Sequence, residues 1–62
     1  MENEKFNMGL RKFLKHVGVT SQQEVERIVR EQNLHGKLKL KVVLTAKGTD
    51  LKHVIEDQVE ID

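Results

Sequence analysis

The sequence predicts an α+β fold in which two helices, about residues 4–17 and 22–35, pack on a C-terminal antiparallel β-hairpin, about residues 37–47 and 50–61. Three observations predict this order. Apolar residues recur at helical spacing through the first half of the chain. Helix stop and start signals divide that half into two segments. After Gly36 the apolar period changes to two, which is typical of a half-buried strand.

The first predicted helix has one apolar stripe. A spacing of i, i+4, i+7, i+8 and i+11 places five side chains on a single face: Phe6, Leu10, Phe13, Leu14 and Val17. Either Asn3 or Asn7 is the N-cap, and the sequence does not choose between them. Gly18 follows Val17 where a left-handed residue commonly ends a helix, so we expect the first helix to end there.

The second predicted helix begins with a capping box. In the run from Ser21 to Glu24, the Ser hydroxyl and the Glu carboxylate would each accept a hydrogen bond from an otherwise unpaired backbone N–H. Val25, Ile28 and Val29 supply its apolar stripe. Gly36 is the expected stop signal, which sets the end of this helix near residue 35.

The hairpin is predicted together with its register. Gly48-Thr49 suits a two-residue type II′ turn, in which paired residue numbers sum to 97. This alignment brings opposite charges together on one face, and it pairs apolar residues such as Val42 with Ile55 on the other. A slip of one residue would move the apolar set to the outer face, so both faces favour the same register.

Composition and charge exclude several classes of protein. The 62 residues include no Cys or Pro, are 34% charged and carry a formal net charge of +1, so we expect one soluble domain over residues 1–62 without disulfides. The acidic start and the lack of a long apolar run predict a cytoplasmic protein with no membrane segment.

A lone two-stranded sheet has two unpaired edges and is marginally stable at best. We therefore expect a homodimer, or a protein partner that pairs with a strand of the hairpin. The leading hypothesis is a small non-enzymatic protein-interaction module that self-associates through this hairpin. Its specific function stays unknown from the sequence.

The alternative is nucleic-acid binding through a helix-turn-helix-like pair and Lys-rich faces. Its candidate residues are basic: Arg11, Lys12, Lys15, Arg27 and Arg30. Against it, acidic residues between these positions oppose contact with phosphates, and both Phe residues lie on the apolar stripe rather than in a base-stacking position.

Catalytic, cofactor and metal sites are not predicted. The sole Ser, Ser21, is assigned to a helix cap, and no Gly-rich phosphate loop is present. His53 and Asp57 interrupt an apolar strand face, but four residues along a strand place them about 13 Å apart, too far to share an ion directly. We expect these two residues to lie at the margin of the core or in an interface.

A family resemblance rests mainly on residues 6–22. The segments Phe6-Asn7-Met8, Arg11-Lys12-Phe13-Leu14-Lys15 and Val17-Gly18-Val19-Thr20-Ser21-Gln22 resemble a family of short uncharacterised bacterial proteins, catalogued as a domain of unknown function. The hairpin from Lys37 to Asp62 is similar to the C-terminal half of that family more loosely. The resemblance implies a bacterial, cytoplasmic protein and transfers no catalytic or binding residue.

Overall fold

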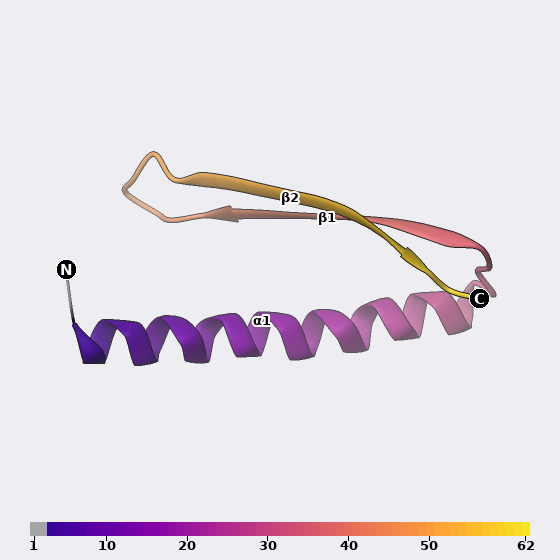
Figure 1. Ribbon diagram of the computed structural model, residues 1–62, viewed down its shortest axis with the longest axis horizontal. Helices are drawn as coiled ribbons and strands as arrows, with labels where there is room; N and C mark the ends of the chain where they lie inside the picture. Colours follow the sequence, from indigo (N-terminus) through magenta and orange to yellow (C-terminus); the bar gives the residue numbers. More distant parts are fainter. Residues whose placement is uncertain (1–2) are drawn as a thin grey trace.

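The computed structural model describes residues 3–62 and contains one helix followed by one hairpin. Helix α1 spans Glu4–Glu31, strand β1 spans Lys37–Thr45 and strand β2 spans Lys52–Glu60 (Figure 1). The α+β class is confirmed. The prediction of two helices is wrong, because α1 runs from Glu4 to Glu31 as one uninterrupted helix.

The N-terminus of α1 is capped by Asn3, which decides between the two predicted caps. Asn3 has extended backbone angles, and its side-chain oxygen accepts a hydrogen bond from the Phe6 N–H at 3.1 Å. Its carbonyl accepts the first helical bond, from the Asn7 N–H at 2.9 Å. Asn7 therefore lies inside the first turns of the helix.

Residues 18–24, predicted to separate two helices, form the middle of α1. The Thr20 hydroxyl donates to the His16 carbonyl oxygen at 2.7 Å, so this polar side chain bonds along the helix instead of capping a new one. A break would leave four N–H and four C=O groups without helical partners. Keeping Gly18 in a helix interior costs only about 1 kcal/mol relative to Ala. The continuous helix is therefore the more favourable arrangement.

The C-terminus of α1 ends at Glu31, four residues before the predicted end. Asn33 takes a positive φ of 52°, the Leu34 N–H bonds to the Val29 carbonyl at 3.0 Å, and the Asn33 N–H bonds to the Arg30 carbonyl at 3.4 Å. This is the Schellman pattern, with Asn in the position that Gly occupies more often. Gly36 also has a positive φ, of 83°, but it lies in the connection to β1.

The predicted hairpin register is confirmed along the whole ladder. The paired residues run from Lys37 opposite Glu60 to Thr45 opposite Lys52, and Val42 lies opposite Ile55. We call the side that carries Leu38, Leu40, Val42 and Leu44 of β1 the inner face, and the opposite side the outer face. On the inner face His53 pairs with Leu44 and Asp57 with Leu40.

The turn differs from the prediction. The Thr49 N–H donates to the Ala46 carbonyl at 3.2 Å, and Gly48 takes a φ of 81°. Gly48 is therefore the third residue of a four-residue turn, not the first central residue of a type II′ turn. The Thr49 hydroxyl also donates to the Ala46 carbonyl, at 2.8 Å. Consequently β1 ends at Thr45 and not at the predicted residue 47, and β2 begins at Lys52 and not at the predicted residue 50.

The last residues of the chain are tied to the connection between α1 and β1. The Ile61 N–H donates to the Gly36 carbonyl at 2.7 Å. Asp62 accepts a hydrogen bond from the Gly36 N–H at 2.8 Å and lies 2.7 Å from Nδ1 of His35. We call these contacts of Ile61 and Asp62 with His35 and Gly36 the clasp.

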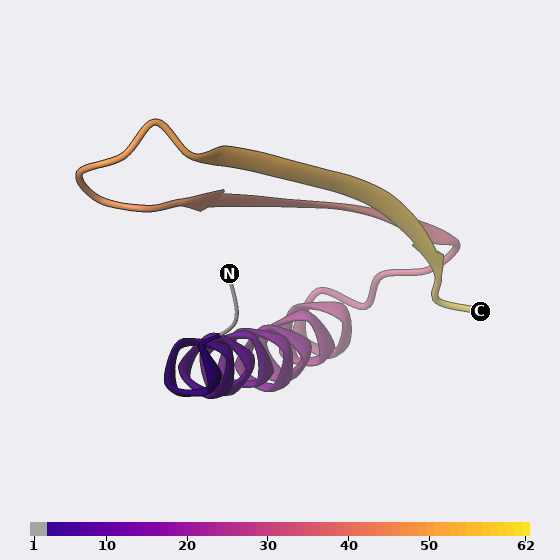
Figure 2. The same cartoon turned by 60° about the vertical axis from the view of Figure 1, so that its left-hand side comes forward.

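The hairpin lies along α1, and the two are joined at the end where the clasp lies (Figures 1 and 2). The N-terminus of α1 and the hairpin turn lie at the other end. No Cα atom of α1 is within 8 Å of a Cα atom of either strand. The molecule measures 44 × 21 × 17 Å, and its radius of gyration of 15.0 Å exceeds the roughly 11 Å of a compact chain of this length.

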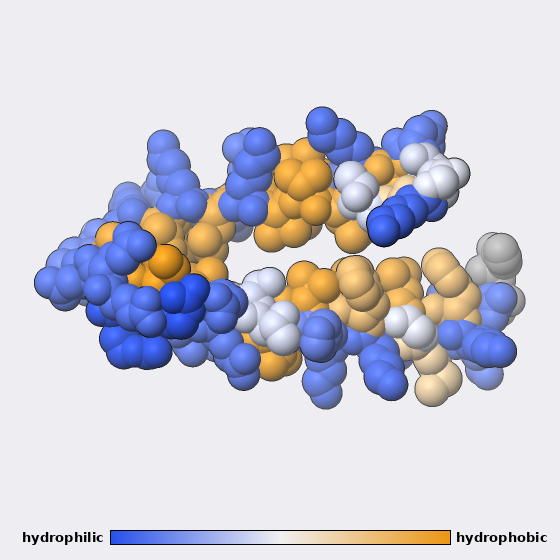
Figure 3. All heavy atoms as spheres, turned by 180° about the vertical axis from the view of Figure 1, so that it is seen from behind, coloured by the Kyte–Doolittle hydropathy of each residue, from blue (hydrophilic) through white to orange (hydrophobic). Residues whose placement is uncertain are grey.

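The apolar side chains gather on facing sides of the helix and the hairpin without forming a closed core. Figure 3 shows these surfaces separated by an open gap, with hydrophilic side chains on the outer face of the hairpin. Within residues 3–62 no side chain is fully buried. The most covered apolar residues, each half-buried, include Val25, Val29, Leu38, Leu40 and Ile61.

Candidate functional site

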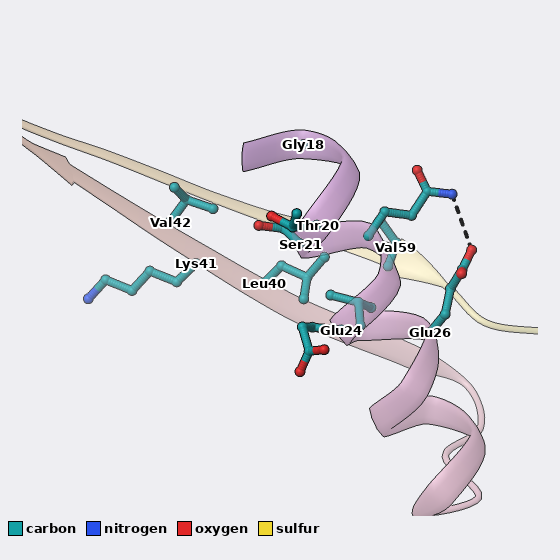
Figure 4. A pocket seen from close by; sticks show the side chains of 11 residues that line it. Gly18, Thr20, Ser21, Glu24, Glu26, Leu40, Lys41, Val42 and Val59 are labelled. Carbon is teal, nitrogen blue, oxygen red and sulfur yellow. Dashed lines mark hydrogen bonds between the residues drawn. The ribbon is translucent and has the colours of Figure 1, made fainter. Parts of the chain in front are cut away.

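The main concave feature of the described chain is an apolar cleft between the middle of α1 and the inner face of the hairpin (Figure 4). Its volume is about 640 Å³ and its lining is mainly apolar. We call it the cleft; its lining residues are Gly18, Thr20, Ser21, Gln22, Glu24, Val25, Glu26, Leu40, Lys41, Val42 and Val59. A smaller hollow continues toward the clasp, between Val25 and Val29 of α1 and Leu38 and Ile61 of the hairpin.

Small side chains leave room for the cleft. Gly18, Thr20 and Ser21 lie on the α1 wall, while Leu40 and Val42 lie on the hairpin wall (Figure 4). A Cβ atom added to Gly18 would have no neighbour within 4 Å. The residues that the sequence presents as a helix break thus line the cleft.

Charged and amide groups lie along the α1 rim of the cleft and bond to one another. The Gln22 side-chain amide donates to Glu26 at 3.1 Å. Arg27 forms ion pairs with Glu24 at 2.8 Å and with Glu31 at 3.0 Å. The hydrogen bond from Arg27, together with its positive charge, lowers the pKa of Glu24. The rim is therefore a set of solvated pairs one helical turn apart.

A second apolar surface lies on the N-terminal half of α1. It is the stripe identified from the sequence, formed by Phe6, Leu10, Phe13, Leu14 and Val17. The first four of these side chains are exposed, with Phe6 at 60% and Phe13 at 48%. The apolar surface of α1 faces the hairpin across an open gap (Figure 3), and the exposure of these side chains shows that the hairpin of the same chain does not cover the stripe.

The basic residues of the nucleic-acid hypothesis fall into two groups. Arg11, Lys12 and Lys15 surround Met8 in a surface depression on the N-terminal half of α1. Arg27 and Arg30 lie about 24 Å farther along the helix, and Arg27 is held by two carboxylates. Because α1 is a single helix, the predicted helix-turn-helix does not exist.

His53 and Asp57 are both exposed and lie on the inner face. Asp57 accepts a hydrogen bond from the Gln58 N–H at 2.7 Å. Among residues 3–62, no three His, Asp or Glu side chains are grouped so that they could hold a metal ion. Neither residue lines the cleft.

The edges of the hairpin are the other predicted site. In the described part of the chain, β1 and β2 pair only with each other, so each strand has one free edge. On the outer face, Lys37 lies opposite Glu60 and Lys41 opposite Glu56, as predicted. None of these four forms an ion pair within 4 Å among the residues described.

A family model described as "Family of unknown function (DUF6494)" matches residues 1–62. The chain belongs to this family. The match extends the resemblance seen over residues 6–22 to the entire hairpin. Among curated proteins and solved structures, no match to this DUF6494 chain is found. The described part of the chain has no helix of the length and apolar character needed to cross a membrane.

Sequence reasoning identified the residues of both apolar walls but not the cleft between them. The inner face follows from the alternation of apolar residues along β1, and the α1 wall from Val25 and its neighbours. The signal for the cleft is the presence of three small residues close together, Gly18, Thr20 and Ser21, which local helix rules assign to a turn. Only the placement of the hairpin opposite these residues shows their role.

Proposed function

We propose that this DUF6494 protein is a small non-enzymatic interaction module that binds an apolar protein segment in the cleft. The observation that carries this proposal is the exposure of two apolar side chains, Val42 and Val59, on the hairpin wall of the cleft. Val42 on the hairpin wall is 47% exposed although it lies on the inner face. Soluble proteins rarely leave contiguous apolar surface open unless another molecule covers it.

The chemistry of the cleft supports binding over catalysis. Its lining is mainly apolar, and its titratable lining residues are Glu24, Glu26 and Lys41. The two carboxylates are on the rim and bonded to Arg27 and Gln22, and Lys41 belongs to the outer face of β1. General acid–base catalysis needs such groups directed at a substrate. Contact with an apolar segment needs only the area and shape that the two walls offer.

The test uses two neighbouring valines with nearly equal exposure on opposite faces of β1. Val42 is 47% and Val43 49% exposed, but Val42 lines the cleft and Val43 lies on the outer face. A photo-crosslinking benzoylphenylalanine is placed at each position in turn and activated in extract from cells that naturally carry the chain. We expect specific protein adducts from position 42 and few from position 43. Equal adducts from both positions, or none from either, would refute the cleft as an interaction site.

The nucleic-acid alternative predicts binding that weakens log-linearly with salt. The pairing of Arg27 with two carboxylates and the separation of the two basic groups along α1 speak against this alternative. The bacterial origin and cytoplasmic location expected from the sequence stay predictions, as does strand pairing at the hairpin edges.

A further inference from the structure

We infer that the partner is a second copy of this chain, and that the two copies bury their stripes and close their clefts in one shared core. This inference rests on the proposed function and names the partner for the same site. It is carried by the surface area of the single chain, by the open gap between the apolar faces of α1 and the hairpin, and by the absence of any fully buried side chain among residues 3–62.

The surface area indicates how much the single chain leaves uncovered. Its accessible surface is 6033 Å². A compact monomer of 7.2 kDa would expose roughly 4,100 Å², which leaves an excess of roughly 1,900 Å² per chain. Two copies that bury this excess would form an interface of roughly 3,800 Å², within the range of obligate homodimers. The excess is thus about the area that a stable dimer needs.

The open gap between α1 and the hairpin indicates where the second copy lies. The apolar surfaces of the two face each other across this gap (Figure 3). On its two sides Phe6 of the stripe is 60% exposed and Val42 of the inner face is 47% exposed. Part of a second copy that enters the gap would therefore contact the stripe and the open side of the cleft together.

A second copy supplies what these surfaces require. It carries the same apolar walls, and in a two-fold contact the same surface of both copies forms the interface. A net charge of +1 per chain produces little repulsion between copies at physiological salt. A chain without a buried core needs a partner over its apolar surface whenever it is folded. Each folded chain must therefore have one partner molecule available. Another copy meets this condition without a second gene product.

The first test is the solution mass of the purified full chain, measured by light scattering across a wide concentration range. We expect twice the chain mass of 7.2 kDa, with dissociation to monomer on dilution accompanied by loss of helical circular dichroism. A folded monomer at all concentrations would overturn the inference.

Two exposed apolar residues on the same half of α1 provide a matched pair of variants. Phe13 lies in the stripe, whereas Met8, 70% exposed, lies on nearly the opposite side of the helix. We expect Phe13→Glu to weaken dimerisation about 100-fold or more, because a two-fold contact contains the substitution twice. Met8→Glu should change the dissociation constant less than about threefold. Equal effects, or a larger effect of Met8→Glu, would contradict the inference.

A measurement on the unaltered sequence covers the case in which Phe13→Glu does not fold. Isotope-labelled and unlabelled chains are mixed, and only contacts between the two kinds are recorded by filtered NMR. We expect such contacts from the methyl groups of Leu10, Leu14 and Val42 and none from Val43; the reverse pattern would overturn the inference. A purified monomer whose position 42 still crosslinks to a different protein in extract would reject the second copy and keep the proposed function. Failure of both tests would reject both.

Discussion

Oδ2 of Asp62 lies 2.7 Å from Nδ1 of His35, although the two residues are 27 positions apart in the chain. The other carboxylate oxygen accepts the Gly36 N–H at 2.8 Å. One side chain thus holds both the connection after α1 and the end of β2. Among residues 3–62, the contact of Asp62 with His35 is the only hydrogen bond between two side chains at distant positions; the others join residues three or four positions apart on α1.

This contact predicts a loss of stability in acid. The hydrogen bond with His35, followed by that from the Gly36 N–H, lowers the pKa of Asp62 below its ordinary value. A carboxyl group whose pKa is lower in the folded state stabilises it above the unfolded pKa of about 3.9, and this contribution is lost as the pH falls through the folded pKa. We expect Asp62→Asn to lower Tm near neutral pH and the difference from wild type to vanish below about pH 3.

Thermal unfolding followed by circular dichroism from pH 7 to pH 2 checks this. Asp50→Asn, which removes a carboxylate outside the clasp, is the control. Its difference in Tm from wild type should not change between pH 7 and pH 2. A difference for Asp62→Asn that stays constant across the whole range would contradict the role of its charge.

A single continuous helix predicts that Gly18→Ala stabilises the protein. Gly18 lies in the interior of α1, and a Cβ atom there meets nothing within 4 Å. The free energy of unfolding should rise by about 1 kcal/mol, because Ala loses less backbone entropy in a helix. Chemical denaturation at fixed protein concentration measures it, and Gly9→Ala should give a similar gain. Destabilisation by Gly18→Ala alone would indicate a helix break at that position.

The cap of α1 predicts opposite effects for two asparagines. Asn3→Ala removes the acceptor for the Phe6 N–H and should lower the free energy of unfolding by about 1 kcal/mol. Asn7→Ala replaces a poor helix former inside the first turns and should raise it by about 0.5 kcal/mol. Denaturant midpoints of the two variants separate these signs. A loss confined to Asn7→Ala would mean that the helix begins later.

The end of α1 predicts that Asn33 tolerates Gly and resists Ala. Its φ of 52° is open to Gly at no steric cost, but costs an Ala side chain roughly 1–2 kcal/mol. We expect Asn33→Ala to be destabilising by about this amount and Asn33→Gly to be neutral or stabilising. Similar losses for both variants would mean that the Asn side chain, and not its backbone angle, is what matters.

The hairpin could be predicted from the sequence in near-complete detail, and the helix could not. Along β1 and β2 each residue's face is fixed by alternation, so apolar pairs such as Val42 and Ile55 favour one register together. The turn was misplaced because Gly48 suits a positive φ at more than one turn position.

The helix was misjudged because its local signals are individually weak. Gly18 destabilises a helix interior by about 1 kcal/mol, and a capping box at Ser21 to Glu24 would stabilise a new helix start by about 1 kcal/mol. Each is less than the cost of leaving the backbone groups at a helix break unpaired. Asn33 was missed as the end because Gly36, three residues later, is the more usual stop signal. The cleft lay beyond sequence reasoning, since it depends on how α1 and the hairpin are placed relative to each other.

The wide spacing between the Cα atoms of α1 and those of the two strands, more than 8 Å throughout, has a consequence for how fast the chain folds. The helix closes on bonds between near neighbours, and the hairpin closes across the six residues between Thr45 and Lys52. Such helices and hairpins form within about 10 μs. Topology therefore places no slow step inside the chain. Under the inference that two copies share a core, the rate of reaching the final state should depend on how often the apolar surfaces of two molecules collide.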